Sequence, residues 1–182
     1  PITVQVLPVS KNPDFKSCAR IYGTKRIYVH SIISLKALDP EQRKKYDSFC
    51  FEREYEDLKY TLVHEYVHVL TLIKKMDGSP KWLWEGAAVA LSGQLKHTQM
   101  GQHSKFAISK IHSINICKAP ISDKDAYLIG GALLNFYELK SSGFIRDLIS
   151  SVAKDPNQNV QQFIEARNLN CEVSSQDIVA AI

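Results

Sequence analysis

The sequence TLVHEYVHVL, residues 61–70, lies at the centre of the pattern that decides the fold of this chain. Apolar side chains recur at helical spacing through this stretch and on either side of it, at Leu58, Leu62, Tyr66, Val69 and Ile73. Spacing of this kind predicts one amphipathic helix over about residues 55–75. The sequence DGSP, residues 77–80, marks the end of that helix, since glycine and proline commonly follow a helix C-terminus.

Two histidines stand four residues apart on this predicted helix, with a glutamate beside the first. His64 and His68 therefore project from one face, with their imidazoles about one turn apart. In the H-E-x-x-H arrangement two imidazoles bind zinc, and the glutamate, here Glu65, acts as general base on a zinc-bound water. Ordinary residue frequencies produce this short pattern by chance in on the order of one per cent of chains of this size. A zinc site therefore needs a third protein ligand from elsewhere in the chain.

The best candidate for the third ligand is Glu85. It lies in KWLWEGAAVALSG, residues 81–93, which predicts a second apolar helix directly after the turn. A second helix packed back against the first brings Glu85 toward the open face of the histidine pair. Two imidazoles and one carboxylate form a ligand set of catalytic zinc sites, in which one coordination position stays open. Trp82 and Trp84 in this segment are expected to pack against neighbouring helices rather than to line a substrate pocket.

HEYVH, followed by a short loop and PKWLWEGAA, resembles the gluzincin metallopeptidases, including their peptidase MA-like, collagenase-type and aminopeptidase-type branches. The later segment AYLIGGALLNFYELKSSGFIRDLISSVAKD is similar to the helical stretch that follows the glutamate helix in peptidase MA-like proteins. The resemblance covers about residues 55–155 and is strongest over about residues 64–90. It implies a zincin-like fold and a hydrolase of peptide bonds that uses one catalytic Zn²⁺. The implied site consists of the zinc ligands His64, His68 and Glu85 and the catalytic glutamate Glu65.

Two departures from the gluzincin pattern narrow this implied activity. Thermolysin-type members carry an aspartate four residues after the ligand glutamate, where this chain has Val89. Aminopeptidase-type members carry a G-x-M-E-N sequence that recognises the substrate N-terminus, and this chain has no such sequence. We therefore expect an endopeptidase rather than an aminopeptidase.

A tyrosine is a further candidate for catalysis. Enzymes of this resemblance often supplement the metal with a Tyr or His donor from a later helix, which stabilises the charge that develops on the carbonyl oxygen. Tyr127 begins the helix predicted by DAYLIGGALLNFYELK, in which Gly130 and Gly131 predict a close approach to a neighbouring helix. Tyr127 is therefore the expected oxyanion donor, with Tyr137 as the substitute. The alternative for Tyr127 is a packing role with a satisfied hydroxyl.

The first part of the chain predicts strands. ITVQVLPV, residues 2–9, is β-branched and alternating, and RIYVHSI, residues 26–32, is a second strand candidate. Residues 25–31 are expected to form the exposed edge along which an extended peptide substrate lies. Asp39 and Pro40 then form an N-cap arrangement that marks the start of the helical part.

These elements predict an α+β fold in one domain. A small N-terminal β-sheet with an edge strand occupies mainly residues 1–35, and a mostly helical body occupies residues 39–182. The 182 residues contain 45% hydrophobic and 23% charged residues, which is close to globular averages. No linker is long enough to divide the chain, so residues 1–182 are expected to form a single metallopeptidase-like catalytic domain.

Charge and hydropathy limit the expected partners. The net charge of +4 comes from 23 basic and 19 acidic residues spread along the chain, which is typical of a solvated surface and not of a nucleic-acid interface. No apolar run approaches the roughly 18 residues that a membrane span requires. We therefore expect a peptide or protein substrate, no nucleic acid and no membrane span. The sequence leaves the oligomeric state open.

The four cysteines and the chain start bear on the compartment. Cys18, Cys50, Cys117 and Cys171 are scattered without a C-x-x-C pair, so buried thiols and one or two disulfides are equally compatible with the sequence. The chain starts at Pro1, and its first residues lack the basic start and apolar region of a signal peptide. A secreted or extracytoplasmic location is expected only if a signal peptide has been trimmed.

The sequence as a whole predicts a zinc-dependent endopeptidase. The alternative is a catalytically inactive, zinc-stabilised gluzincin-like domain that binds a protein or peptide partner. The two differ in whether Glu65 is needed for turnover or only for structure.

Overall fold

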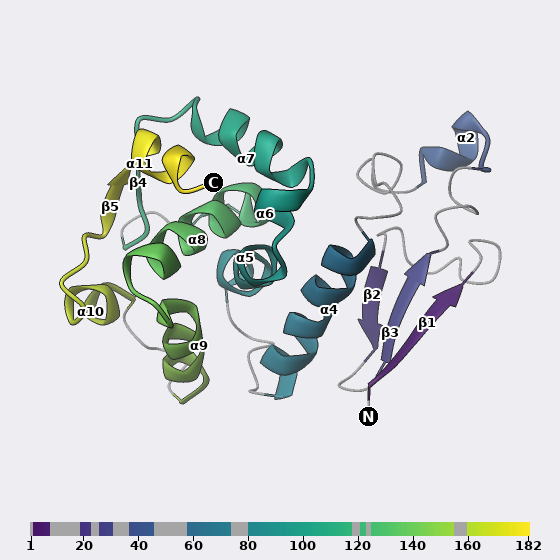
Figure 1. Cartoon of the computed structure of the whole chain (residues 1–182), viewed down its shortest axis with the longest axis horizontal. Coiled ribbons are helices and arrows are strands. Elements are labelled where there is room, and N and C mark those ends of the chain that lie inside the picture. Colours follow the sequence, from purple (N-terminus) through teal and green to yellow (C-terminus); the bar gives the residue numbers. More distant parts are fainter. Residues whose placement is uncertain are drawn as a thin grey trace.

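The structure is a computed structural model with a mixed α+β architecture. It describes residues 2–7, 19–22, 26–30, 37–45, 58–73, 80–117, 121–122, 125–154 and 160–182. A three-stranded sheet lies at one end of the molecule, most helices lie at the other, and helix α4 lies between them (Figure 1). The predicted order of a small N-terminal sheet followed by a mostly helical body is confirmed.

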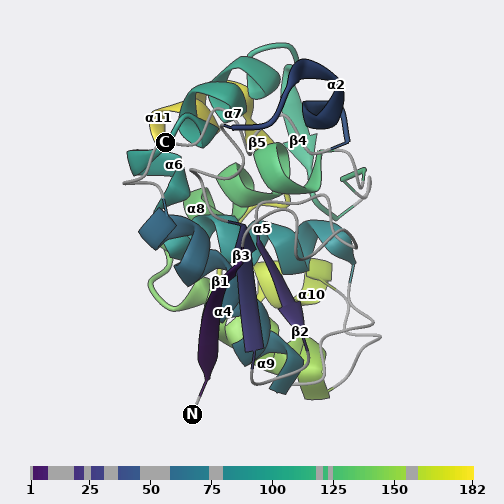
Figure 2. The same cartoon turned by 90° about the vertical axis from the view of Figure 1, so that its right-hand side faces the viewer.

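The N-terminal sheet has the strand order β1-β3-β2 and is seen face-on in Figure 2. The two predicted strands are present as β1 (Thr3–Leu7) and β3 (Arg26–His30), and β2 (Ala19–Tyr22) was not predicted. Strand β3 pairs in parallel with β1 and antiparallel with β2, so it is the central strand. The prediction that residues 25–31 form the exposed edge is therefore wrong for Arg26–His30, and β1 and β2 are the outer strands among the described residues. Four residues are too few for the alternation of β2 to stand out in the sequence.

One face of the sheet packs against α4, which spans Leu58–Ile73. Alternation along the strands places Ala19, Ile27 and Val29 on this face, where they form a small buried cluster with Val69 of α4. The opposite side of α4 carries the histidines and packs against α5 (Lys81–Ser92). Both predicted helices are confirmed within the described residues, and α4 connects the sheet to the helical body.

Helix α5 is held between α4 and a later helical segment. That segment begins with a wide π-helical turn, η3 (Ala126–Gly130), and continues as α8 (Gly131–Lys140). A Cβ on Gly86 of α5 would lie 2.7 Å from the carbonyl carbon of Gly130, well inside the ordinary contact distance of about 3.5–4.0 Å. Glycine at these positions therefore permits the close helix approach predicted from the Gly130-Gly131 pair.

The other helices surround this central packing. They are α2 (Pro40–Arg43), α6 (Gln94–His97), α7 (Met100–Ile108), α9 (Phe144–Lys154), α10 (Val160–Glu165) and α11 (Ser175–Ala180). The predicted N-cap of α2 is confirmed, because the Asp39 carboxylate accepts a hydrogen bond from the Gln42 backbone N–H at 2.8 Å. The helices α6 and α7 were not predicted, since their sequence is polar and lacks an apolar stripe.

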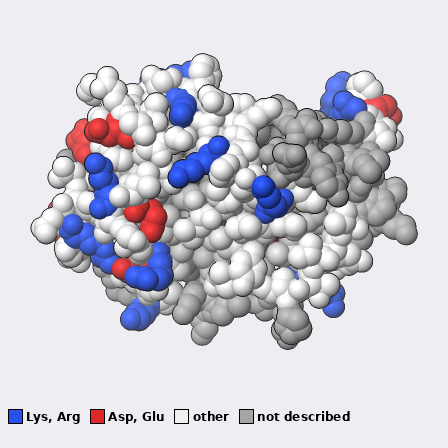
Figure 3. Space-filling view, in the orientation of Figure 1, with Lys and Arg blue, Asp and Glu red and all other residues white. Residues whose placement is uncertain are grey.

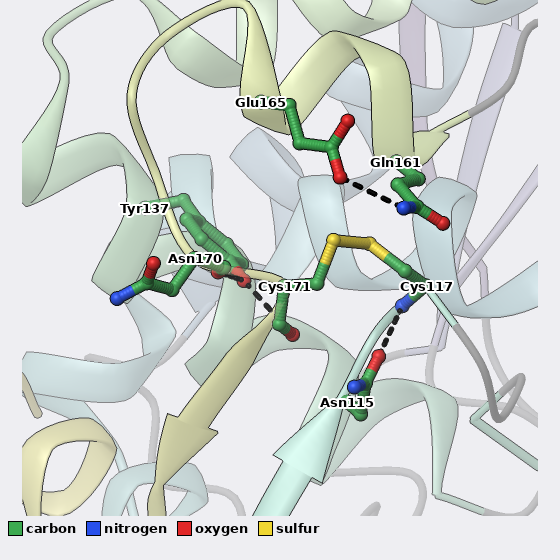
Figure 4. The surroundings of a disulfide bond; sticks show 7 residues. All are labelled: Asn115, Cys117, Tyr137, Gln161, Glu165, Asn170 and Cys171. Atoms are coloured by element: carbon green, nitrogen blue, oxygen red, sulfur yellow. Dashed lines mark hydrogen bonds between the residues drawn. A yellow bond between two sulfur atoms is a disulfide. The ribbon is translucent and has the colours of Figure 1, made fainter.

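A second, two-stranded sheet lies at the side of the helical body away from the N-terminal sheet (Figure 1). Its strands β4 (Ser113–Asn115) and β5 (Glu172–Ser174) pair antiparallel. A disulfide joins Cys117, just after β4, to Cys171, just before β5 (Figure 4). The sequence left open whether the cysteines are free thiols or form disulfides, and the structure shows a disulfide for this pair. Cys18 and Cys50 lie outside the described residues.

The described residues form no helix that is long and apolar enough to cross a membrane. On the face drawn in Figure 3, Lys and Arg side chains lie in separate groups, with Asp and Glu side chains among them on the left of the view. The charges described on this face therefore form no continuous patch of one sign.

Candidate metal centre

Three side chains from two helices converge at the interface of α4 and α5. The Nε2 atom of His68 lies 3.0 Å from Nε2 of His64 and 3.0 Å from Oε2 of Glu85. The remaining separation, from His64 Nε2 to Glu85 Oε2, is 3.4 Å. All three side chains are buried, and their candidate ligand atoms lie within 4.8 Å of one another. This group could hold a metal ion.

Helix geometry and one interhelical hydrogen bond account for this convergence. Four residues of helix bring the imidazoles of His64 and His68 together, with ring centroids 4.7 Å apart. On the facing helix, the Trp84 indole N–H donates to Thr71 Oγ1 at 2.7 Å. The Thr71 hydroxyl in turn donates to the His68 carbonyl oxygen at 2.9 Å. These bonds join α5 to α4 beside Glu85, the neighbour of Trp84 in sequence.

The two tryptophans of α5 both have packing roles, as predicted. Trp82 is buried in the main hydrophobic core. The Trp84 ring packs on His68, with centroids 4.7 Å apart, and its indole N–H is bonded to Thr71. Trp84 thereby limits the orientation of a candidate ligand.

Burial and hydrogen bonding set the charge states of the two carboxyl groups. Burial alone raises the pKa of Glu85, but its interactions with the adjoining imidazoles of His64 and His68 outweigh burial and hold the pKa of Glu85 well below its usual range. Burial raises the pKa of Glu65, and its electrostatic interaction with the same imidazoles only partly offsets this. Glu85 is thus the ionised ligand candidate, and Glu65 is the carboxyl group that holds a proton more readily.

The two ring nitrogens that face away from the cluster have different surroundings. Nδ1 of His64 lies 3.0 Å from the side-chain oxygen of Gln94, the first residue of α6. Nδ1 of His68 is buried and has no hydrogen-bond partner among the described residues. Sequence reasoning missed Gln94, because no spacing relates it to the H-E-x-x-H pattern.

The structure brings Tyr127 to the centre and keeps Tyr137 away from it. The Tyr127 ring stacks on His64, with centroids 6.0 Å apart and planes at 10°. The π-helical turn carries Tyr127, and its wide i→i+5 bond runs from the Gly130 N–H to the Asp125 carbonyl oxygen. Tyr137 is fully buried in the core, where its hydroxyl donates to the Asn170 carbonyl oxygen at 2.7 Å (Figure 4). Tyr137 therefore cannot substitute for Tyr127 at this site.

The donor set matches a transition-metal ion better than an alkaline-earth ion. Two imidazole nitrogens and one carboxylate oxygen, buried together, suit zinc and neighbouring transition metals, whereas calcium and magnesium prefer oxygen ligands.

Comparisons of the chain with protein-family models, with curated proteins and with solved structures gave no match. The similarity to gluzincins therefore rests on the residues quoted above.

Proposed function

We propose that this chain is a zinc-dependent peptidase of the gluzincin type with a zincin-like fold, and that it cleaves internal bonds of peptides or proteins. The observation that carries the proposal is the convergence of His64 Nε2, His68 Nε2 and Glu85 Oε2 within 3.4 Å of one another, with Glu65 buried beside them. The gluzincin resemblance likewise implies that His64, His68 and Glu85 are zinc ligands and that Glu65 is the catalytic glutamate. Two neutral imidazoles and one carboxylate are a known ligand set for a catalytic zinc ion with an open position.

In this proposal the residues around the ion divide the work of hydrolysis. Zinc supplies Lewis-acid chemistry, which makes water more acidic and polarises the scissile carbonyl. Glu65 takes the proton from the attacking water and passes it to the leaving nitrogen. Tyr127, stacked on His64, is the proposed donor to the carbonyl oxygen.

The disulfide supports a location outside the reducing cytoplasm. Bonds of the Cys117–Cys171 kind persist in oxidising compartments and are rare where glutathione keeps thiols reduced. We therefore propose a secreted or extracytoplasmic protein, whose substrates are peptides or proteins in the same compartment.

The metal assignment is tested by zinc analysis of purified variants. The parent is expected to bind about one zinc ion per chain, and His68→Ala and Glu85→Ala are expected to lose it, because each removes one of three ligands. His112→Ala, a histidine outside the cluster, is the matched control and should keep the parent zinc content. Parent-level zinc in either ligand variant would contradict the assignment.

The catalytic role is tested by peptide cleavage with Glu65→Gln, which keeps the side-chain size and removes the charge. This variant is expected to bind zinc and to cleave no peptide in a mixture that the parent cuts at internal bonds. Glu165→Gln, a carboxylate on α10 away from the centre, is the control. Undiminished cleavage by Glu65→Gln would refute its role as base.

An exposed apolar stripe on α4 favours the alternative function as a partner-binding domain. Val63, Tyr66 and Leu70 are 42–45% exposed and follow one another at helical spacing. A parent protein that binds zinc but cleaves no peptide with or without Glu65 would support this zinc-stabilised, inactive domain.

A further inference from the structure

We propose that Gln94 is a positioning residue of the metal centre, which fixes the tautomer and the ring orientation of His64. The inference rests on the metal-binding part of the proposed function and does not require catalysis. Its basis is the 3.0 Å separation between the Gln94 side-chain oxygen and His64 Nδ1, on the side of the ring away from His68 and Glu85.

The chemistry of the amide oxygen determines the tautomer. A carbonyl oxygen only accepts hydrogen bonds, so the proton of neutral His64 must be on Nδ1 for this contact to be a hydrogen bond. The lone pair then lies on Nε2, the atom that faces His68 Nε2 at 3.0 Å and Glu85 Oε2 at 3.4 Å. Without the acceptor, His64 would divide between two tautomers, and only one of them presents a lone pair to the metal.

Gln94 lies beside His64 because the chain ends helix α5 at Gly93 and starts helix α6 directly afterwards. Gly93 closes α5 in the left-handed conformation, with φ of 83°, and α6 begins at the next residue. Glycine takes this conformation at little cost, so the chain turns sharply directly after the helix that carries Glu85. The Ser92 hydroxyl accepts the Gln94 backbone N–H at 3.4 Å, and the Gln94 carbonyl accepts the Thr98 hydroxyl at 2.8 Å.

A second contact holds α6 against α4. The rings of Tyr60 and His97 stack with centroids 5.0 Å apart and planes at 5°. Tyr60 lies one turn before His64 on α4, and His97 lies one turn after Gln94 on α6. The stacked rings and the Gln94–His64 contact thus join the same two helices one turn apart, which limits how far the amide can move from the imidazole.

The contact is selective for one of the two candidate histidine ligands. Within the described part of the chain, Nδ1 of His68 has no hydrogen-bond partner, whereas Nδ1 of His64 has Gln94. Residue 89, where thermolysin-type enzymes carry an aspartate, is occupied by Val89, which is buried against Gly131. A neutral amide from the following helix therefore contacts the ligand histidine, and it adds no charge to the centre.

Two substitutions at Gln94 separate hydrogen bonding from packing. Gln94→Met keeps the length and helix propensity of the side chain and removes its strong acceptor. Gln94→Glu keeps an acceptor in the same place. Gln102→Ala, on α7 and exposed, is the control outside the contact. Gln94→Ala replaces Gln94→Met if the methionine variant does not fold.

The main measurement is the dissociation constant for zinc, obtained by competition with a chelator of known affinity. Gln94→Met is expected to weaken zinc binding about 10- to 100-fold, as is typical when a hydrogen-bond partner of a ligand histidine is lost. Gln94→Glu is expected to bind zinc at least as tightly as the parent, and Gln102→Ala equally tightly. Parent-like affinity in Gln94→Met, or equal weakening in Gln94→Glu, would overturn the role of the amide acceptor.

Nitrogen-15 NMR of the zinc-free protein supplies a readout that does not involve the metal. The His64 ring is expected to carry its proton on Nδ1 in the parent and to shift toward the Nε2–H tautomer in Gln94→Met. An unchanged tautomer would also overturn the proposal. If the parent does not bind zinc, the metal site itself is overturned. If the parent binds zinc and Gln94→Met binds it equally tightly, only the role of Gln94 is overturned.

Discussion

Replacing Gly86 by alanine is expected to destabilise the protein, although alanine is the better helix former. In the interior of α5, helix propensity alone favours alanine by about 1 kcal/mol. The new Cβ would lie 2.7 Å from the carbonyl carbon of Gly130, 2.9 Å from its oxygen and 3.1 Å from the Gly131 nitrogen. These are backbone atoms, which cannot rotate away as a side chain can.

The net effect follows from comparing the two energies. Overpacking of a core costs about 1–3 kcal/mol, and close contact with backbone atoms of Gly130 and Gly131 places Gly86→Ala at the upper end of that range. After the propensity gain, a loss of about 2 kcal/mol remains. For a chain of this size, that loss lowers the Tm by about 4–8 °C. Because Glu85 is the preceding residue, movement of α5 should also weaken zinc binding.

Urea unfolding in the presence of chelator, followed by far-UV circular dichroism, measures the free energy of unfolding of the metal-free protein. The reciprocal control is Ala90→Gly, one turn further along α5, which should cost about 1 kcal/mol through helix propensity. If Gly86→Ala instead proved about 1 kcal/mol more stable than the parent, helix propensity would dominate, and the close contact with Gly130 would be refuted.

Three further predictions concern Tyr127, Tyr137 and the disulfide. Tyr127→Phe should lower kcat about 10- to 1000-fold with little change in KM, because it removes a donor that acts in the transition state; a parent-like kcat in the zinc-loaded variant would exclude that role. Burial raises the pKa of Tyr137 above its usual value near 10, so the unfolded chain releases this proton at a lower pH than the folded protein does. The free energy of unfolding should therefore be unaffected by Tyr137 below about pH 10 and should decrease as the pH rises further. The Tyr137→Phe variant should lack this loss of stability at alkaline pH. At neutral pH its free energy of unfolding should be about 1 kcal/mol lower than that of the parent, because the hydrogen bond to Asn170 is lost. An equal dependence of stability on alkaline pH in both proteins would contradict the assignment. Replacing Cys117 and Cys171 together by serine, at a sequence separation of 54, should cost about 4 kcal/mol of unfolding free energy, and an unchanged urea midpoint would contradict this value.

The candidate ligand set was readable from the sequence because its parts are local. The spacing of His64 and His68 acquires meaning from helix geometry alone, since residues four apart share a face on any α-helix. Glu85 follows on the next helix after a short connection, and two apolar helices joined by few residues usually pack side by side. The close approach at the Gly130-Gly131 pair was likewise readable, because two adjacent glycines inside a helix remove the side chains that would keep a neighbour away.

Tertiary structure alone decided the features that depend on distant pairing. Strand β3 became the centre of the sheet because β1 and β2 pair with it on both sides, and no local pattern states which edges of a strand are taken. The disulfide between Cys117 and Cys171 depends on the pairing of β4 with β5, two strands that lie far apart in the sequence. Gln94 reaches His64 only through the left-handed turn at Gly93, so its role depends on where α6 lies in space. Periodicity reports which face of an element is buried, whereas the partner on that face is selected by packing among the whole set of elements.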